Sequence, residues 1–233
     1  MAVVAETVER REGLAAHFRI GFLLLALIAG IVFAADSVAA LYATYLPGDV
    51  AVERGIQSVP WGPLIPAFQA FDWLEGLRQT GLAVAGIVLV LLLNRRGVLL
   101  MIFGALSGAV YTVVQAEIHR PRPDASLVHV IRHTGNYSYP SGHVVFFTWF
   151  LALLIVCLGI RYLPRPAVRV LWVIAALIVL TVALGRVYDA EHWPSDVVGG
   201  FSLGVAWSAL GLAIRRLSDP VLEPLRKARA AAP

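Results

Sequence analysis

Long apolar segments alternate with short polar ones along this chain, and this pattern restricts it to folds that cross a lipid bilayer several times. Six segments are candidate spans: Ile20–Tyr42, Gly81–Leu93, Val98–Ile118, His143–Ile160, Val168–Leu184 and Val197–Ile214. A helix needs about 20 apolar residues to cross the hydrocarbon core. Backbone groups inside lipid must be hydrogen-bonded within their own segment, so the spans are expected to be helical. The sequence predicts an all-α bundle of six transmembrane helices.

The composition also favours a membrane protein over a soluble domain. Hydrophobic residues make up 59% of the 233 residues and charged residues 15%, and the mean hydropathy is +0.76. Soluble domains are usually about 45–50% apolar and about 25% charged. The length fits one domain over residues 1–233, with a tail at 1–19, the bundle at 20–214 and a tail at 215–233. The single cysteine, Cys157, allows no internal disulfide.

The basic residues predict the orientation. With the N-terminus inside, thirteen of the 19 Lys and Arg residues fall on the inner side, as is typical of cytoplasmic loops. Both termini are therefore expected to be cytoplasmic, with the loops after the third and fifth spans facing the periplasm or exterior of a bacterial inner membrane. The first span is interpreted as an anchor, since 19 residues precede it. No basic patch is interleaved with aromatics, so nucleic-acid binding is not expected.

The segment Leu46–Thr80 joins the first two spans on the outer side and carries four large aromatic side chains. These are Trp61, Phe68, Phe71 and Trp73. An amphipathic helix at the lipid interface would explain the pattern, and so would an aromatic belt. The segment could also form a side wall of a lipid-binding cleft. Asp36, an acid inside the first span, is expected to snorkel towards the interface.

His192 and Asp196 stand at the start of the sixth span and suggest a nucleophile with its orienting acid. Pro194 suits the first turn of a helix, so His192 precedes that helix and Asp196 lies within its first turn. A carboxylate four residues on can bond one ring nitrogen and leave the other nitrogen free to attack. The alternative is a capping acid beside an interfacial histidine.

The sequence Pro140-Ser141-Gly142-His143 opens the fourth span and is typical of an anion site. Ser141 is a good N-cap, and Gly142 lets the backbone approach an anion closely. Free N–H groups at a helix start bind phosphate. His143 would lie in the same turn, where an imidazolium could protonate a leaving oxygen.

Two arginines complete the set of candidates. Guanidinium groups bind phosphate oxygens in a bidentate manner and stabilise charge that develops during transfer. Arg122 follows the third span, and Arg186 ends a fifth span that is almost free of charge, where an arginine requires an anionic partner. Arg120 is a second candidate beside Arg122.

Together these residues resemble the type 2 phosphatidic acid phosphatase family of membrane lipid phosphatases, which includes undecaprenyl diphosphate and phosphatidylglycerol phosphate phosphatases. The family signatures are Lys-x6-Arg-Pro, Pro-Ser-Gly-His and Ser-Arg-x5-His-x3-Asp. The second is complete at Pro140–His143. The third matches at Arg186, His192 and Asp196, and the first at Arg122-Pro123. Six spans, with motifs after the third and fifth, also follow the family layout.

Two positions depart from these signatures. Gln115 stands where the first signature has lysine, and Gly185 where the third has serine. Gln115 can still donate a hydrogen bond to phosphate but lacks the charge, and losing an ionic contact costs about 1.5–3 kcal/mol. His119, Arg120 or His133 could compensate.

The resemblance implies roles for the site residues and a substrate class. His192 would be the nucleophile, Asp196 would orient it, and His143 would protonate the leaving group. The phosphoryl group would be held by Arg122, Arg186, Ser141, Gly142 and Gln115. No metal or other cofactor is expected. The substrate would be a lipid phosphate or diphosphate that enters sideways from the outer leaflet, with undecaprenyl diphosphate favoured over phosphatidylglycerol phosphate and phosphatidic acid.

Three other interpretations remain open. His129 and His133, with Glu117, His119 or Asp124, could bind a metal, although no compact set of three ligands is evident. The same residues could transfer phosphate from a lipid to an alcohol instead of water. A lipid-binding protein without turnover would keep the fold, and the changes at Gln115 and Gly185 fit that interpretation. The sequence does not indicate an oligomeric state.

Overall fold

A computed structural model describes residues 2–135 and 137–230, with side chains described for 19–135 and 137–222. The described chain consists of helices and connecting loops, with an isolated bridge between Pro121 and Tyr137 in the loop between Ile118 and Gly142. Its helices are α1 (Ala2–Tyr42), α2 (Asp49–Gln57), α3 (Ile65–Trp73), α4 (Leu77–Asn94), α5 (Val98–Ala105), α6 (Ser107–Ile118), α7 (Gly142–Leu154), α8 (Ile160–Tyr162), α9 (Arg165–Tyr188), α10 (Pro194–Ala213) and α11 (Arg215–Ala230). Short turns of other helix types are η1 (Gly62–Leu64), η2 (Arg95–Gly97) and η3 (Ile155–Gly159).

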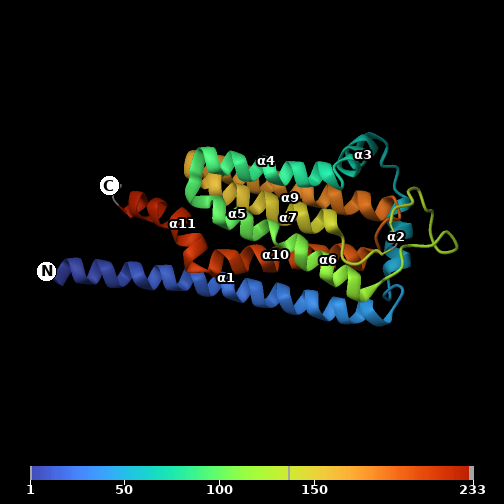
Figure 1. Ribbon diagram of the computed structural model, residues 1–233, viewed down its shortest axis with the longest axis horizontal. Helices are drawn as coiled ribbons and strands as arrows, with labels where there is room; N and C mark the ends of the chain where they lie inside the picture. Colours follow the sequence, from blue (N-terminus) through green and yellow to red (C-terminus); the bar gives the residue numbers. More distant parts are fainter. Residues whose placement is uncertain (1, 136, 231–233) are drawn as a thin grey trace.

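Five helical stretches of the described chain are long and apolar enough to cross a membrane, where the sequence predicted six spans. They are Arg19–Tyr42, Leu77–Ile118, Gly142–Tyr162, Arg165–Tyr188 and Pro194–Ala213. The stretch Leu77–Ile118 has 42 residues and contains both the second and the third predicted span. Figure 1 shows that it turns back at η2, so that α4 and α5–α6 run in opposite directions.

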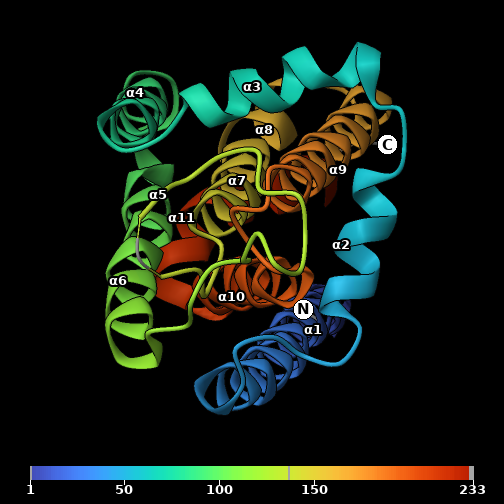
Figure 2. The ribbon, with the colours of Figure 1, turned by 90° about the vertical axis from the view of Figure 1, so that its right-hand side faces the viewer.

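The bundle is built around α7. Figure 2 shows α7 surrounded by α4, α5, α9 and α10, all of which contact it. In the most apolar part of the stretch α7–α8, 72% of the residues are buried inside the protein. The corresponding shares are 6% for α1 and 11% for α9. The exposed residues of α1 and α9 are apolar, which is the surface that lipid requires. The aromatic side chains Phe146, Trp149 and Phe150 fill the centre of the core.

Glycines on α10 let it lie directly against α7 and α1. A Cβ atom on Gly200 would be 2.6 Å from the backbone oxygen of Ser141, and one on Gly204 would be 2.6 Å from Cβ of Thr148. A Cβ on Gly199 would be 2.6 Å from Oδ2 of Asp36. Asp36 therefore points towards α10, which differs from the snorkelling expected. Small residues permit such close helix contacts inside membranes.

The segment between α1 and α4 folds over the end of the bundle that lies opposite the two chain ends (Figure 1). It forms α2 and α3 where the sequence predicted one interfacial segment. Phe68 is buried, with its ring centre 5.8 Å from that of Trp61 and 5.7 Å from that of Tyr188. Trp73 is 60% exposed. Part of the aromatic set thus packs onto α9, while part remains free to meet lipid or water.

Replacing Gly200 with alanine should destabilise the protein and move the start of α7. The added methyl group meets the backbone of Ser141, which cannot rotate away, and overpacking of this kind costs about 1–3 kcal/mol. Thermal unfolding in detergent measures the effect. Gly30→Ala is the matched control, because nothing lies within 4 Å of a Cβ there. Equal unfolding temperatures for the two variants would contradict the packing described.

Candidate active site

The loops and helix starts that carry the predicted motifs meet at one end of the bundle, beside a cavity of about 510 Å³. The predicted residues Arg122, Gly142, His143 and His192 line this cavity. Its wall also includes residues of α4 and of the α5–α6 segment. These are Gln79, Thr80, Ala83, Ala105, Ser107, Gly108, Tyr111 and Thr112. The structure therefore brings both predicted histidines and one predicted arginine together.

His192 is held by a backbone carbonyl. Its Nδ1 lies 2.6 Å from the carbonyl oxygen of Ser138 and 3.8 Å from Oδ2 of Asp196. A carbonyl oxygen only accepts, so Nδ1 carries the proton and Nε2 keeps its lone pair. Burial lowers the pKa of His192, and the neighbouring Asp196 partly offsets this effect. The imidazole is therefore neutral and able to attack at neutral pH.

Asp196 is fully buried, and its carboxylate contacts both the start of α10 and the ring of His192. Its Oδ2 accepts a hydrogen bond from the backbone N–H of Trp193 at 2.8 Å, which caps the helix. Its Oδ1 lies 2.5 Å from Nη1 of Arg120. The expected direct bond from Asp196 to His192 is thus longer than the bond to Ser138, because both carboxylate oxygens already have closer partners.

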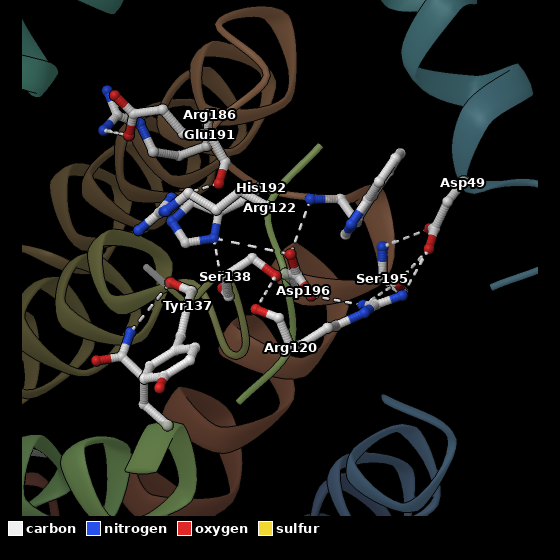
Figure 3. Close-up of polar contacts among 12 residues, drawn as sticks. Asp49, Arg120, Arg122, Tyr137, Ser138, Arg186, Glu191, His192, Ser195 and Asp196 are labelled. Atoms are coloured by element: carbon white, nitrogen blue, oxygen red, sulfur yellow. Dashed lines mark hydrogen bonds and ion pairs between the residues drawn. The ribbon is translucent and has the colours of Figure 1, made fainter. Parts of the chain in front are cut away.

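Arg120, the second arginine candidate, lies outside the cavity in a buried polar cluster (Figure 3). Its guanidinium contacts Asp196, and also Oδ2 of Asp49 at 3.0 Å and Oγ of Ser195 at 2.8 Å. Asp49 accepts further hydrogen bonds from the backbone N–H and the hydroxyl of Ser195. Arg120 thereby joins α2 to the start of α10. Asp49 and Ser195 are far apart in the chain, so no local sequence pattern could predict this contact.

The start of α7 carries polar groups without a partner among the described residues, and Gly142 and His143 line the cavity there, whereas Ser141 does not. Ser141 is the N-cap residue, but its side chain forms no capping bond, and its buried Oγ has no hydrogen-bond partner among the described residues. The first N–H groups of a helix have no partner within the helix. His143 lines the cavity, and its buried Nε2 also has no partner in the described part of the chain. This arrangement can receive an anion.

The two predicted phosphate-binding arginines differ in position. Arg122 lines the cavity and donates to the backbone oxygens of Gly135 and Glu191. Arg186 is fully buried and does not line the cavity. Its guanidinium pairs with Asp72, and also with Oε2 of Glu191 at 2.7 Å. The expectation of an anionic partner for Arg186 is met by carboxylates of the protein itself.

Glu191 and Arg132 are site residues that sequence reasoning missed. The carboxylate of Glu191 lies between Arg186 and Arg132, with its Oε1 3.2 Å from Nε of Arg132. Arg132 also pairs with Glu75 at 2.9 Å. Glu191 immediately precedes the candidate nucleophile His192 in the sequence. This adjacency is the feature from which Glu191 could have been predicted as a site residue.

Gln115 and the histidines considered for a metal site are not among the residues that line the cavity. Gln115 does not line the cavity, and its amide donates to the hydroxyl of Tyr111 at 2.8 Å. Within residues 2–135 and 137–230, no group of three or more His, Cys, Asp or Glu side chains is arranged to hold a metal ion. His129, His133, Glu117, His119 and Asp124 therefore form no such cluster there.

Glu53 on α2 is a buried carboxyl group near the Arg120 cluster. It is fully buried, and neither carboxylate oxygen has a hydrogen-bond partner among the described residues. Burial raises its pKa to about 8, and the negative charges of Asp49 and Asp196 act in the same direction. Glu53 is therefore protonated in the folded protein at neutral pH.

Replacing Arg120 with methionine should lower the free energy of unfolding by about 3–5 kcal/mol, because Asp49 and Asp196 would remain buried without a counter-charge. Denaturant unfolding in detergent measures the loss. Arg54→Met is the control, since the Arg54 side chain is exposed on α2 and, among the described residues, bonds only the carbonyl of Leu127. If both variants are equally stable, the Arg120 cluster does not hold the fold together.

Replacing Glu53 with glutamine should remove a pH dependence of stability. The folded state keeps the Glu53 proton up to about pH 8, whereas the unfolded chain releases it near the ordinary value of 4.5. The wild-type unfolding free energy should therefore fall as pH rises from about 5 to 8 and level off above that. Thermal unfolding across this range tests the difference between wild type and Glu53→Gln. The exposed Glu117→Gln should behave like wild type, and an identical slope for Glu53→Gln would refute the assignment.

Comparisons with known proteins identify a family and similar proteins. A family model described as the PAP2 superfamily matches residues 96–218. Phosphatidylglycerophosphatase B of Bacillus subtilis (strain 168) is 34% identical over 110 residues, which are 46% of this chain and 51% of that protein. Undecaprenyl-diphosphatase of Sulfolobus acidocaldarius is 35% identical over 79 residues, 34% of each chain. The chain thus matches about half and about a third of the length of these relatives.

A solved structure shares the fold. It is the crystal structure of the first transmembrane PAP2 type phosphatidylglycerolphosphate phosphatase from Bacillus subtilis, with a TM-score of 0.66 and 21% identity. The match covers 80% of this chain and 93% of the other. At this identity the likeness concerns the fold alone. Because the family model covers more than half of the chain and the shared fold is transmembrane, the protein is an integral membrane member of the PAP2 superfamily.

Proposed function

We propose that the protein is a membrane lipid phosphatase that hydrolyses a lipid phosphate or diphosphate through a phosphohistidine, without a metal. The observation that carries this proposal is the position of His192. Its Nδ1–H is bound by the Ser138 carbonyl, and its ring lines the same cavity as His143, Arg122 and the start of α7. The proposed nucleophile His192, the proposed acid His143 and the anion-binding donors therefore line the same cavity.

The proposed reaction has two steps. Nε2 of His192 attacks phosphorus, the bond from phosphorus to the leaving oxygen breaks, and protonated His143 gives its proton to that oxygen. His143, now neutral, then takes a proton from water, whose oxygen attacks the phosphohistidine. Inorganic phosphate leaves, and both histidines return to their starting states. Arg122 and the N–H groups of α7 would stabilise the phosphoryl charge in both steps.

Asp196 and Arg186 have supporting roles in this proposal. Asp196 stabilises positive charge that develops on His192 during attack, acting from 3.8 Å. Arg186 can reach a phosphoryl oxygen only when its ion pair with Glu191 opens. The substrate phosphate would then replace the Glu191 carboxylate as the partner of Arg186.

We place the protein in the membrane with six crossings, because α4 and α5–α6 run in opposite directions. Both termini would be cytoplasmic, with α2 and α3 at the outer interface. The cavity is lined by α4 and the α5–α6 segment as well as by the catalytic loops. A lipid of the outer leaflet would enter sideways between these helices, with its first tail atoms against Ala83, Ala105 and Phe146.

Undecaprenyl diphosphate is the favoured substrate, because an outward-facing site meets this carrier after polymer transfer. Phosphatidylglycerol phosphate is the second candidate, followed by phosphatidic acid. The names of the two relatives support both leading classes. Transfer to an alcohol and lipid binding without turnover are the other functions to be tested.

Phosphate release from detergent-purified protein tests the proposal. Undecaprenyl diphosphate should be hydrolysed faster than phosphatidylglycerol phosphate, phosphatidic acid and a soluble phosphoester, and a chelator should not reduce the rate. His192→Ala should reduce release by at least about a thousandfold, because the nucleophile is lost. His129→Ala, in an exposed loop, should match wild type.

Three outcomes would contradict parts of the proposal. Wild-type activity no higher than that of His192→Ala would exclude catalysis. Preference for the soluble ester would exclude a lipid phosphatase. Phosphate appearing on an added alcohol, with none released, would identify a transferase.

A further inference from the structure

Tyr111 lies on α6 one helical turn before Gln115, the residue at the lysine position of the first signature. Gln115 stands at the signature lysine position but does not line the cavity. Its Nε2 donates to Oη of Tyr111 at 2.8 Å and to the backbone oxygen of Tyr137 at 3.4 Å. Residues four apart on α6 share a face, so Gln115 supports a side chain one turn nearer the cavity.

The phenol of Tyr111 lies directly over the start of α7. Tyr111 lines the cavity with Arg122, His143 and His192. A Cβ atom on Gly142 would be 2.9 Å from Cζ of Tyr111 and 3.2 Å from its Oη. Only glycine fits at position 142 with the phenol there. An anion bound by the first N–H groups of α7 would therefore lie within reach of this hydroxyl.

The hydrogen bond from Gln115 fixes which way the Tyr111 hydroxyl can donate. An amide nitrogen only donates, so the phenol oxygen accepts from Gln115 and keeps its own proton for another partner. In the described part of the chain, the structure records no acceptor for that proton. The Tyr111 hydroxyl can therefore direct its proton into the cavity, which Tyr111 lines.

We propose that Tyr111 donates a hydrogen bond to the phosphoryl group and, positioned by Gln115, replaces the lysine of the first signature. The inference rests on the proposed phosphatase function and assigns a further substrate-binding residue to it. A neutral donor takes the place of a cation, so the cationic part of the phosphate cradle is left to Arg122. The change at Gln115 is thus compensated within the same helix, and not by His119, Arg120 or His133.

Tyr111→Phe tests the hydroxyl, because it keeps the ring that packs over Gly142. A hydrogen bond to a charged group is worth about tenfold to a hundredfold in binding. We expect kcat/KM for phosphate release to fall by that factor and inhibition by orthovanadate, which mimics the transferring phosphoryl group, to weaken by a similar factor. Tyr162→Phe is the matched control, since its hydroxyl bonds the carbonyl of Leu93 at the other end of the bundle. It should leave both quantities unchanged.

Two further variants separate ligand binding from packing. Tyr111→Phe combined with Gln115→Lys should recover activity and vanadate inhibition, because the lysine can supply the missing donor directly. Tyr111→Phe combined with Gln115→Met should not. If Tyr111→Phe fails to fold, Gln115→Met alone decides, since it keeps the phenol and removes only its support. Weaker vanadate inhibition then supports the inference, and unchanged inhibition overturns it.

The outcome also distinguishes this inference from the proposed function. If wild type releases phosphate faster than His192→Ala while Tyr111→Phe equals wild type in kcat/KM and vanadate inhibition, the role of Tyr111 is wrong and the phosphatase stands. If wild type is no faster than His192→Ala, the phosphatase itself is wrong.

Discussion

The arrangement of the site depends on the buried ion pairs of Arg120 with Asp49 and Asp196. The Arg120 guanidinium is removed from water and must be matched by anions and acceptors. It finds Asp196 at the start of α10 and Asp49 at the start of α2, together with the hydroxyl of Ser195. Three segments far apart in the chain are thereby fixed to one another. The Asp196 carboxylate beside His192 is thus also part of the ion-pair cluster that joins α2 to α10.

This double use of Asp196 explains how His192 is oriented. With one carboxylate oxygen on Arg120 and the other capping α10, the carbonyl of Ser138 becomes the closer partner of Nδ1. Ser138 belongs to the loop that leads into the Pro-Ser-Gly-His sequence. His192 on one loop is therefore positioned by the loop that leads into α7, whose first turn carries His143. Close contact between α7 and α10 at Gly200 keeps the two loops together.

The site residues predicted from the sequence differ in where the structure places them. His143, His192 and Arg122 were assigned from spacing and do line one cavity. Arg186 was assigned in the same way, yet it pairs with Asp72 and Glu191 behind the cavity wall. Spacing identifies a residue type at a helix end, but it cannot show which of several nearby carboxylates reaches a guanidinium first. Glu191, Arg132 and Glu53 went unnoticed for the same reason.

The apolar segments by themselves determined a helical membrane fold. A backbone in lipid satisfies its hydrogen bonds only in a helix or a closed β-barrel, and continuous apolar segments of about 20 residues have the length of a spanning helix. Their motifs also determined that two histidines and an arginine would lie at one end of that fold, because short spacings before a helix translate directly into position. Only the tertiary structure decided which polar groups pair with one another. Those pairs join α2 to α10 through Arg120 and α3 to α9 through Arg186, across long stretches of chain. Burial, not sequence distance, determines the partner of each charge.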